Sequence, residues 1–228
     1  MRIPAIVLFI LINVTNTFAQ QQSANDREAY MKVITERAGK ITATLGINND
    51  EKADKVTAFI RDQYSNLNDI YTIRDAKYKS IKTSYKEDKT QLDTLIAKEN
   101  RKIEASISKL HHKYLKNLAT ELNASEIEKV KDGMTYGVLP LTYRAYQEQL
   151  LNLTAAQKNQ ILIWLTEARE KAMDAESSDR KHAWFGKYKG RINNYLSAQG
   201  YDLKKEGIEW QKRIKAAQEA NKNASKVD

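Results

Sequence analysis

The 228-residue sequence contains no cysteine, which excludes disulfide bonds, a thiol nucleophile and cysteine-ligated zinc or iron–sulfur centres. It also contains only two prolines and eight glycines. A β-sandwich needs turn residues about every 8–12 positions, so this scarcity argues against a many-turned β fold. Because 41% of the residues are hydrophobic, we expect a folded chain with a sizeable core rather than a disordered one.

The first nineteen residues have the pattern of a secretory signal peptide. A basic start at Met1-Arg2 precedes an apolar run over residues 3–14, and Thr17-Phe18-Ala19 supplies a small-residue cleavage site. The alternative is a buried N-terminal helix. The run is too short to span a bilayer and no later segment is longer, so we expect no transmembrane anchor after cleavage. Export without cysteine favours a Gram-negative periplasm or cell surface.

The mature chain, from residue 20, is predicted to be a single all-α domain that ends near residue 220 and is followed by a frayed polar tail over 221–228. Residues 47–132 contain neither glycine nor proline. Within them Tyr64, Tyr71, Tyr78, Tyr85 and Leu92 recur every seven residues, which is typical of a coiled-coil seam. We therefore predict a long antiparallel helical hairpin over 47–122. The tyrosines are interpreted as packing within this seam, while a row that contacts a partner remains the alternative.

The turns and boundaries of the helices are predicted from capping signals. Asp88 followed by Gln91 is expected to begin the second helix of the hairpin, after a turn near residues 86–89. Thr154 and Gln157 form a second such pair in the C-terminal helical bundle, which we assign to residues 123–220. Pro140 indicates one short extended crossing in this bundle, through Val138 and Leu139, because a residue before proline avoids the α region.

One segment, residues 181–196, is dense in the side chains that carbohydrate sites use. Aromatic rings stack on sugar faces, and planar or cationic donors bind hydroxyls and carboxylates. Gly186 and Gly190 share a helix face and are expected to permit the close approach of another element. The alternative is an ordinary helix with core aromatics and solvated cations. The candidate ligand-binding residues are Trp184, Lys187, Tyr188, Arg191, Asn194 and Tyr195.

Catalysis is the competing interpretation, based on acidic pairs at helical spacing. Glu167, Glu170 and Asp174 could lie on one face, as acid–base or metal chemistry requires, although exposed helices often carry such pairs. The catalytic candidates are Glu170, Asp174, His182, Tyr136 and Arg144. No phosphate-binding glycine loop, serine-hydrolase motif or zinc-binding histidine motif is present, so we expect no cofactor and no metal.

The net charge of +9 is unevenly distributed. Twelve basic and six acidic residues lie between Arg74 and Lys116, and ten basic and three acidic residues lie between Arg180 and Lys215. In an exported protein these basic regions favour an acidic polysaccharide or oligosaccharide, or outer-membrane lipid, over nucleic acid as the partner. A lysine-rich solvated surface is the alternative.

Two sequence blocks, Asp132–Gln157 and Lys181–Glu206, resemble the secreted Bacteroidetes family called domain of unknown function 3826. The resemblance covers nearly the whole mature chain. It implies a signal peptide and a helical domain. It also implies that the gene is often found beside genes for polysaccharide degradation, notably of pectin-type glycans, but it implies no established activity. A second, shorter match, Leu153–Gln157, is similar to the LTxxQ motif of helical periplasmic stress chaperones. A capping box accounts for that match without common descent.

Three functions are therefore carried forward. The first is a binding or accessory protein of polysaccharide use. The second is a hydrolase or lyase that acts on acidic oligosaccharides, and the third is a periplasmic helical chaperone that uses the hairpin. The same patterns leave open whether the chain is an enzyme, which glycan it takes and how many copies associate.

Overall fold

The computed structural model describes the backbone of residues 6–224 and the side chains of residues 25–219. This part of the chain forms eight helices and no strand, which confirms the all-α prediction. The chain divides into two compact units, residues 1–123 and 124–228, and each is described by itself. The helices are α1 (Ile6–Ala43), α2 (Asp50–Ser84), α3 (Lys89–Glu121), α4 (Ala124–Met134), α5 (Val138–Gln149), α6 (Ala155–Met173), α7 (Ser178–Ala198) and α8 (Leu203–Ala224).

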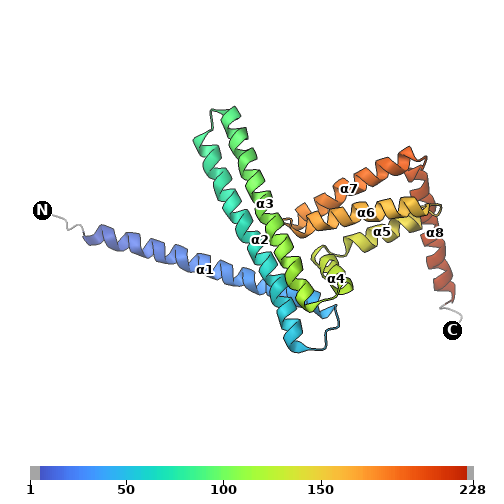
Figure 1. Ribbon diagram of the computed structural model, residues 1–228, viewed down its shortest axis with the longest axis horizontal. Coiled ribbons are helices and arrows are strands. Elements are labelled where there is room, and N and C mark those ends of the chain that lie inside the picture. Colours follow the sequence, from blue (N-terminus) through green and yellow to red (C-terminus); the bar gives the residue numbers. More distant parts are fainter. Residues whose placement is uncertain (1–5, 225–228) are drawn as a thin grey trace. The chain divides into compact units, whose positions relative to one another are not determined.

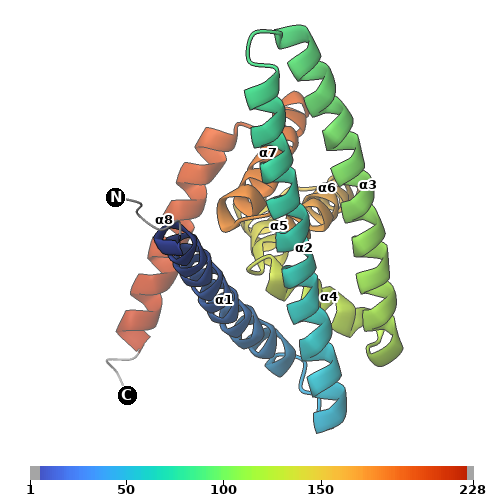
Figure 2. The same cartoon turned by 90° about the vertical axis from the view of Figure 1, so that its left-hand side faces the viewer.

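The first unit contains the long antiparallel hairpin, in which α2 and α3 lie side by side along their length (Figures 1 and 2). A three-residue turn over 85–87 joins them. The Asp88 side chain accepts a hydrogen bond from the Gln91 amide at 2.9 Å, which satisfies one of the free amides at the start of α3. The predicted hairpin and its capping residue are thus confirmed.

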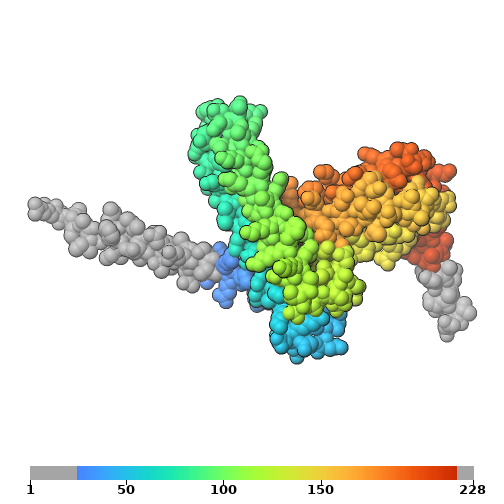
Figure 3. Space-filling view, in the orientation of Figure 1, coloured from blue at the N-terminus to red at the C-terminus, as the bar shows by residue number. Residues whose placement is uncertain are grey.

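The buried core of this unit lies at the base of the hairpin, where α1 packs on α2. The Tyr30 hydroxyl donates to the Tyr64 carbonyl at 3.1 Å, and Arg27 pairs with Asp69 at 2.6 Å. In Figure 3 a blue part of α1 is visible beside the lower part of the hairpin. The buried apolar side chains of the unit are Ile34, Ala38, Ile41, Leu45, Val56, Ile60, Tyr64, Leu67, Tyr114, Leu118 and Leu122.

Beyond that core, the hairpin continues as two helices with no fully buried side chain between residues 68 and 113. The tyrosine row follows this change. Tyr64 is buried, Tyr71 and Tyr78 are half-buried, and Tyr85 is exposed in the turn. Arg74, which interrupts the apolar heptad, lies with its guanidinium carbon 4.6 Å from the Tyr71 ring centre and 5.7 Å from that of Tyr78. A cation–π contact thus replaces the missing apolar residue.

The second unit is a five-helix bundle, α4 to α8, in which α5, α6 and α7 surround a hydrophobic core. The buried members of this core include Tyr146 and Leu150 from α5, Ile161, Leu165, Ala168 and Ala172 from α6, and Phe185, Ile192 and Leu196 from α7. Helix α8 is attached mainly to the end of α5. There Arg213 donates to the carbonyls of Glu148 and Gln149, at 2.8 Å and 3.1 Å.

The extended crossing predicted around Pro140 is wrong. Residues 138–149 are helical, and α4 and α5 are joined only by a tight turn over 135–137. Pro140 is the third residue of α5, where its missing N–H would have had no helical partner in any case. The chain reverses instead through two successive left-handed residues, Tyr136 (φ 60°) and Gly137 (φ 65°).

The ends of the described chain add two observations. Residues 1–5 of the predicted signal peptide lie outside the described backbone, and residues 6–19 are part of helix α1. Helix α8 continues to Ala224, so the first four residues of the predicted frayed tail are helical. Among the described residues, no helix is both long and apolar enough to cross a membrane.

Candidate functional site

Helices α6 and α7 form an antiparallel pair whose start and turn are fixed by side-chain caps. Thr154 and Gln157 make a reciprocal capping box at the start of α6, as predicted. Ser177 accepts from the Arg180 amide at the start of α7. The buried Lys181 ammonium donates to the last carbonyls of α6, those of Ala172 and Met173, at 3.1 Å and 3.0 Å. A cation at this helix end also offsets the negative end of the helix dipole.

This pair carries a surface that we call the α6/α7 aromatic face, composed of Trp164, Glu167, Trp184, Lys187, Tyr188, Arg191 and Tyr195. The rings of Trp164 and Tyr195 meet edge to face, with centres 5.3 Å apart. The Arg191 guanidinium carbon lies 4.5 Å from the Trp164 ring centre, and the Lys187 ammonium lies 5.2 Å from that of Trp184. The four rings are half-buried, because one side of each packs on the hydrophobic core.

Glu167 is the acidic member of this face. Its carboxylate lies 3.7 Å from Arg191, whose side chain is 57% exposed. Burial, together with the negative charge and the hydrogen bond of Glu167, raises the pKa of Tyr188 above its ordinary value of 10.0. Arg191 is held by a long ion pair and a ring contact, so most of its donors remain accessible to a ligand.

The structure brings five of the six predicted ligand-binding residues onto this face: Trp184, Lys187, Tyr188, Arg191 and Tyr195. The sixth, Asn194, is exposed on α7, and its side chain makes no hydrogen bond with a described residue. The expectation for Gly186 and Gly190 is wrong. Leaving aside its chain neighbours and the nearby backbone of α7, no described atom lies within 4 Å of the position that a Cβ would take on either glycine. These glycines lie on an open surface, where they permit no close helix contact.

Two members of the face, Trp164 and Glu167, were not predicted as ligand-binding residues. Both come from α6, whereas the six predicted residues all come from the dense segment of α7. The available signal was spacing: the two residues are three apart in α6, so they lie on one side of that helix. That side of α6 contacts Arg191 and Tyr195 of α7, a pairing that the spacing within α6 does not identify.

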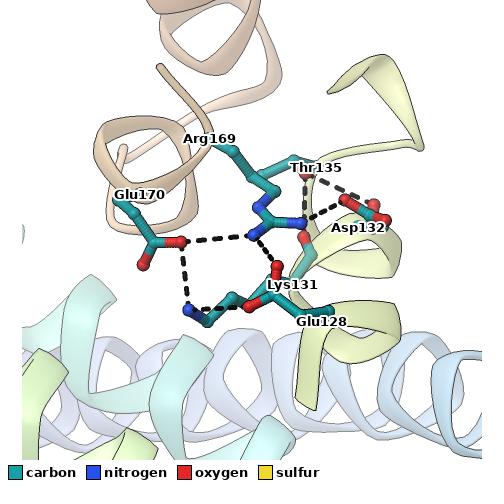
Figure 4. Close-up of polar contacts among 6 residues, drawn as sticks. All are labelled: Glu128, Lys131, Asp132, Thr135, Arg169 and Glu170. Carbon is teal, nitrogen blue, oxygen red and sulfur yellow. Dashed lines mark hydrogen bonds and ion pairs between the residues drawn. The ribbon is translucent and has the colours of Figure 1, made fainter. Parts of the chain in front are cut away.

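A second polar cluster joins α4 to α6, within the second unit, and centres on Arg169 (Figure 4). The Arg169 side chain is only 3% exposed. It pairs with Asp132 at 2.7 Å and with Glu170 at 3.5 Å, and it also pairs with Glu128. Lys131 completes the network through Glu128 at 3.2 Å and Glu170 at 3.1 Å. Two cations and three carboxylates thus form one ion-pair network at the junction of the two helices.

This network disfavours Glu170 as a catalytic acid. A general acid needs a pKa raised toward neutral pH, whereas neighbouring cations favour the ionised carboxylate. Glu128 shows the effect: burial alone would raise its pKa, but the hydrogen bonds and charges of Arg169 and Lys131 lower it below the ordinary value of 4.5. Glu167 and Glu170 also contact different helices, α7 and α4, so the predicted acidic pair does not converge.

The remaining catalytic candidates are only partly brought together. The Tyr136 and His182 rings stack with centres 5.6 Å apart and planes 12° apart, which joins the α4–α5 turn to the start of α7. Asp174 caps the end of α6, four residues beyond Glu170. Arg144 lies on α5, 66% exposed, and its one ion pair is a 3.9 Å contact with Glu148. Among residues 25–219, no group of three or more ligating side chains could hold a metal ion.

The fold and these surfaces define an all-α protein with a helical-hairpin unit and a five-helix unit that carries an aromatic face. Residues 31–216 match the family described as protein of unknown function DUF3826, and the chain belongs to that family. A search of curated proteins found no match. The predicted family is therefore confirmed.

Proposed function

We propose that this protein is a non-catalytic binding or accessory protein of polysaccharide use and that the α6/α7 aromatic face contacts an acidic, pectin-type glycan. The observation that supports this proposal most directly is the grouping of two tryptophans, two tyrosines, Arg191 and Lys187 on one accessible surface. Half-buried rings are held rigidly and lose little conformational entropy when a sugar stacks on them. The two cations favour a glycan that carries carboxylates.

The proposal includes a rearrangement of Arg191. This side chain now lies over the Trp164 ring, where a sugar ring could otherwise stack. Since its ion pair with Glu167 is long and solvent-exposed, little free energy holds it in that position. A glycan carboxylate can therefore attract the guanidinium away from the ring, and the freed face of Trp164 can contact the sugar.

The test is a binding titration with polygalacturonate and, as the neutral control, galactan. Trp184→Leu combined with Arg191→Gln is expected to weaken polygalacturonate binding by at least about tenfold, because a stacking ring and a charged donor are both removed. Arg144→Gln, which removes an exposed arginine elsewhere on this unit, is the matched control and is expected to bind normally. Unchanged binding by the double variant, with the control also normal, would exclude this face.

Analysis of the same mixtures for shortened or unsaturated sugars tests the enzyme alternative. The proposed role predicts binding without product. Product formation that is lost in Glu170→Gln or His182→Ala would replace it with a hydrolase or lyase. The pairing of Glu170 with Lys131 and Arg169 is the structural reason to expect no product.

One observation favours the chaperone alternative, and it concerns the hairpin. Its outer part carries a half-buried seam and an exposed Ile73, features that a non-native client could contact. Suppression of the aggregation of a reduced, unfolding test protein by the full chain, and its loss on Ile73→Glu, would support this function. Identical aggregation with and without the chain would remove it.

We also propose that the protein is exported to the periplasm or cell surface, with cleavage after Ala19. This proposal rests on the basic start, apolar run and small-residue site of the first nineteen residues. Protein recovered from the producing cells should begin at Gln20, as read by terminal sequencing. A chain that retains Met1 would contradict export by this route.

A further inference from the structure

A groove on the other side of α7 from the aromatic face lies between α5, α7 and the start of α8, within the second unit. Its volume is about 610 Å³, which is in the range of small-molecule sites. Leu141, Ala145 and Leu203 give it an apolar wall. None of the described residues that line it is acidic.

Two lysines give the groove its charge. Lys189 of α7 and Lys204 of α8 both line it, and neither ammonium forms an ion pair with a described residue. By contrast, Arg169 and Lys131 of the same unit form ion pairs with carboxylates. Two uncompensated cations beside an apolar wall create a local positive potential, which favours an anionic ligand.

The neutral polar groups of the groove are arranged by contacts within the fold. The Tyr146 hydroxyl donates to Asn193 Oδ1 at 2.7 Å, which leaves both N–H groups of Asn193 Nδ2 without a described partner. Gln149 Nε2 donates to the Leu203 carbonyl at 3.1 Å, so Gln149 Oε1 remains as an acceptor. The Thr142 hydroxyl also lines the groove and makes no described hydrogen bond. Donors and one acceptor therefore face the space beside the two lysines.

These positions are held by rigid contacts. Burial raises the pKa of Tyr146 to about 12, so its hydroxyl remains a donor and keeps Asn193 oriented. Helix α8 lies close to α5 at Gly207, where Gln149 Nε2 is 3.4 Å from the position of an added Cβ. A preorganised set of polar groups loses less entropy on binding than a mobile one.

We propose that this groove binds a small polyhydroxylated anion of one sugar ring, a sugar acid. Lys189 and Lys204 bind its anionic group, Asn193 and Gln149 bind its hydroxyls, and the apolar wall contacts the ring. This site is separate from the α6/α7 aromatic face and requires no polymer. It goes beyond the proposed function, since either site can exist without the other.

The test uses the full chain and four probes: galacturonate, glucose 6-phosphate, galactose and acetate. Galacturonate is expected to bind at least about tenfold more tightly than galactose, which lacks the anionic group, or acetate, which lacks the sugar ring and its hydroxyls. Glucose 6-phosphate distinguishes a carboxylate from a phosphate as the preferred anionic group. Binding of either sugar anion supports the groove, and equal binding of galactose and both anions overturns it.

Variants locate the bound ring. Lys189→Met with Lys204→Met should weaken galacturonate binding by at least about tenfold, because two charge-assisted hydrogen bonds are lost. Lys158→Met with Lys171→Met on α6 removes the same charge outside the groove and should bind normally. Retained affinity in the first pair, or no binding of any probe at about 10 mM, overturns the proposal. Galacturonate affinity that falls in Trp184→Leu/Arg191→Gln but not in Lys189→Met/Lys204→Met would place the ring on the α6/α7 aromatic face and would also overturn the groove.

Discussion

Arg169 provides the sharpest test of how the second unit is stabilised, and the change is Arg169→Met. The variant keeps an unbranched apolar stem but removes the guanidinium of a side chain that is 3% exposed and pairs with three carboxylates. Breaking a buried ion pair by removing one partner costs about 3–5 kcal/mol. The three acidic partners are partly exposed, and the buried Arg169 Nε has no hydrogen-bond partner, so we expect the lower end of that range, about 3 kcal/mol.

The assay is urea unfolding followed by tryptophan emission. All three tryptophans, Trp164, Trp184 and Trp210, lie in residues 124–228, so this signal reports the second unit alone. With an m-value of about 1.5 kcal/mol/M, the midpoint should fall by about 2 M. The unfolding transition of the first unit, followed by helical circular dichroism of the whole chain, should keep its urea midpoint.

Two further variants make the result interpretable. Arg144→Met removes an exposed arginine with one long ion pair and should change stability by less than about 0.5 kcal/mol. Arg169→Lys keeps the charge but loses the planar donor pair, so an intermediate midpoint is expected. A midpoint for Arg169→Met within about 0.5 M of the unmodified protein would refute the reasoning, because the network would then contribute little net stability.

Three other predictions follow from single contacts. Folding lowers the pKa of Glu128, so the ionised carboxylate stabilises the fold above pH 4.5, and this stabilisation is lost as the pH falls through the pKa of the folded state. The difference in unfolding free energy between the unmodified protein and Arg169→Met, measured by urea unfolding, should therefore shrink toward about pH 3. Gly186→Ala should raise stability by about 0.5–1 kcal/mol, because this glycine is in an open helical position. Gly137→Ala should lower stability by about 1 kcal/mol, because this glycine has a left-handed backbone. Thermal unfolding midpoints that shift in the same direction in both variants would contradict this. Lys181→Met should lower stability by about 1–3 kcal/mol, since two carbonyls at the end of α6 lose their donor, and an unchanged tryptophan-emission midpoint would show that water replaces it.

Much of the fold could be predicted because its signals are local. A stretch without glycine or proline and a seven-residue repeat indicated the hairpin, and Asp88 marked the start of its second helix. Pro140 was misleading for a physical reason. The rule that a residue before proline avoids the α region is weakest in the first turn of a helix, which is where Pro140 lies.

The candidate sites were less predictable because they depend on which helices meet. In the sequence, Arg169 is one of several cations on an amphipathic helix. Only the packing of α4 on α6 shows that it is buried among carboxylates. Glu167 and Glu170 are three residues apart, yet Glu167 pairs with a residue of α7 and Glu170 with a residue of α4. Spacing on a helix defines a face, but the neighbours of that face come from contacts distant in sequence. The groove residues on α5, α7 and α8 share no sequence motif for the same reason.

The way in which the first unit is connected has a consequence for how it forms. Each of its helices packs against the next one along the chain, α1 on α2 and α2 on α3, and a three-residue turn closes the hairpin. Because each helix packs on the next one along the chain, no further element has to fold before the two partners can meet. During synthesis the hairpin can assemble once residue 121 has emerged, before the five helices of the second unit are complete.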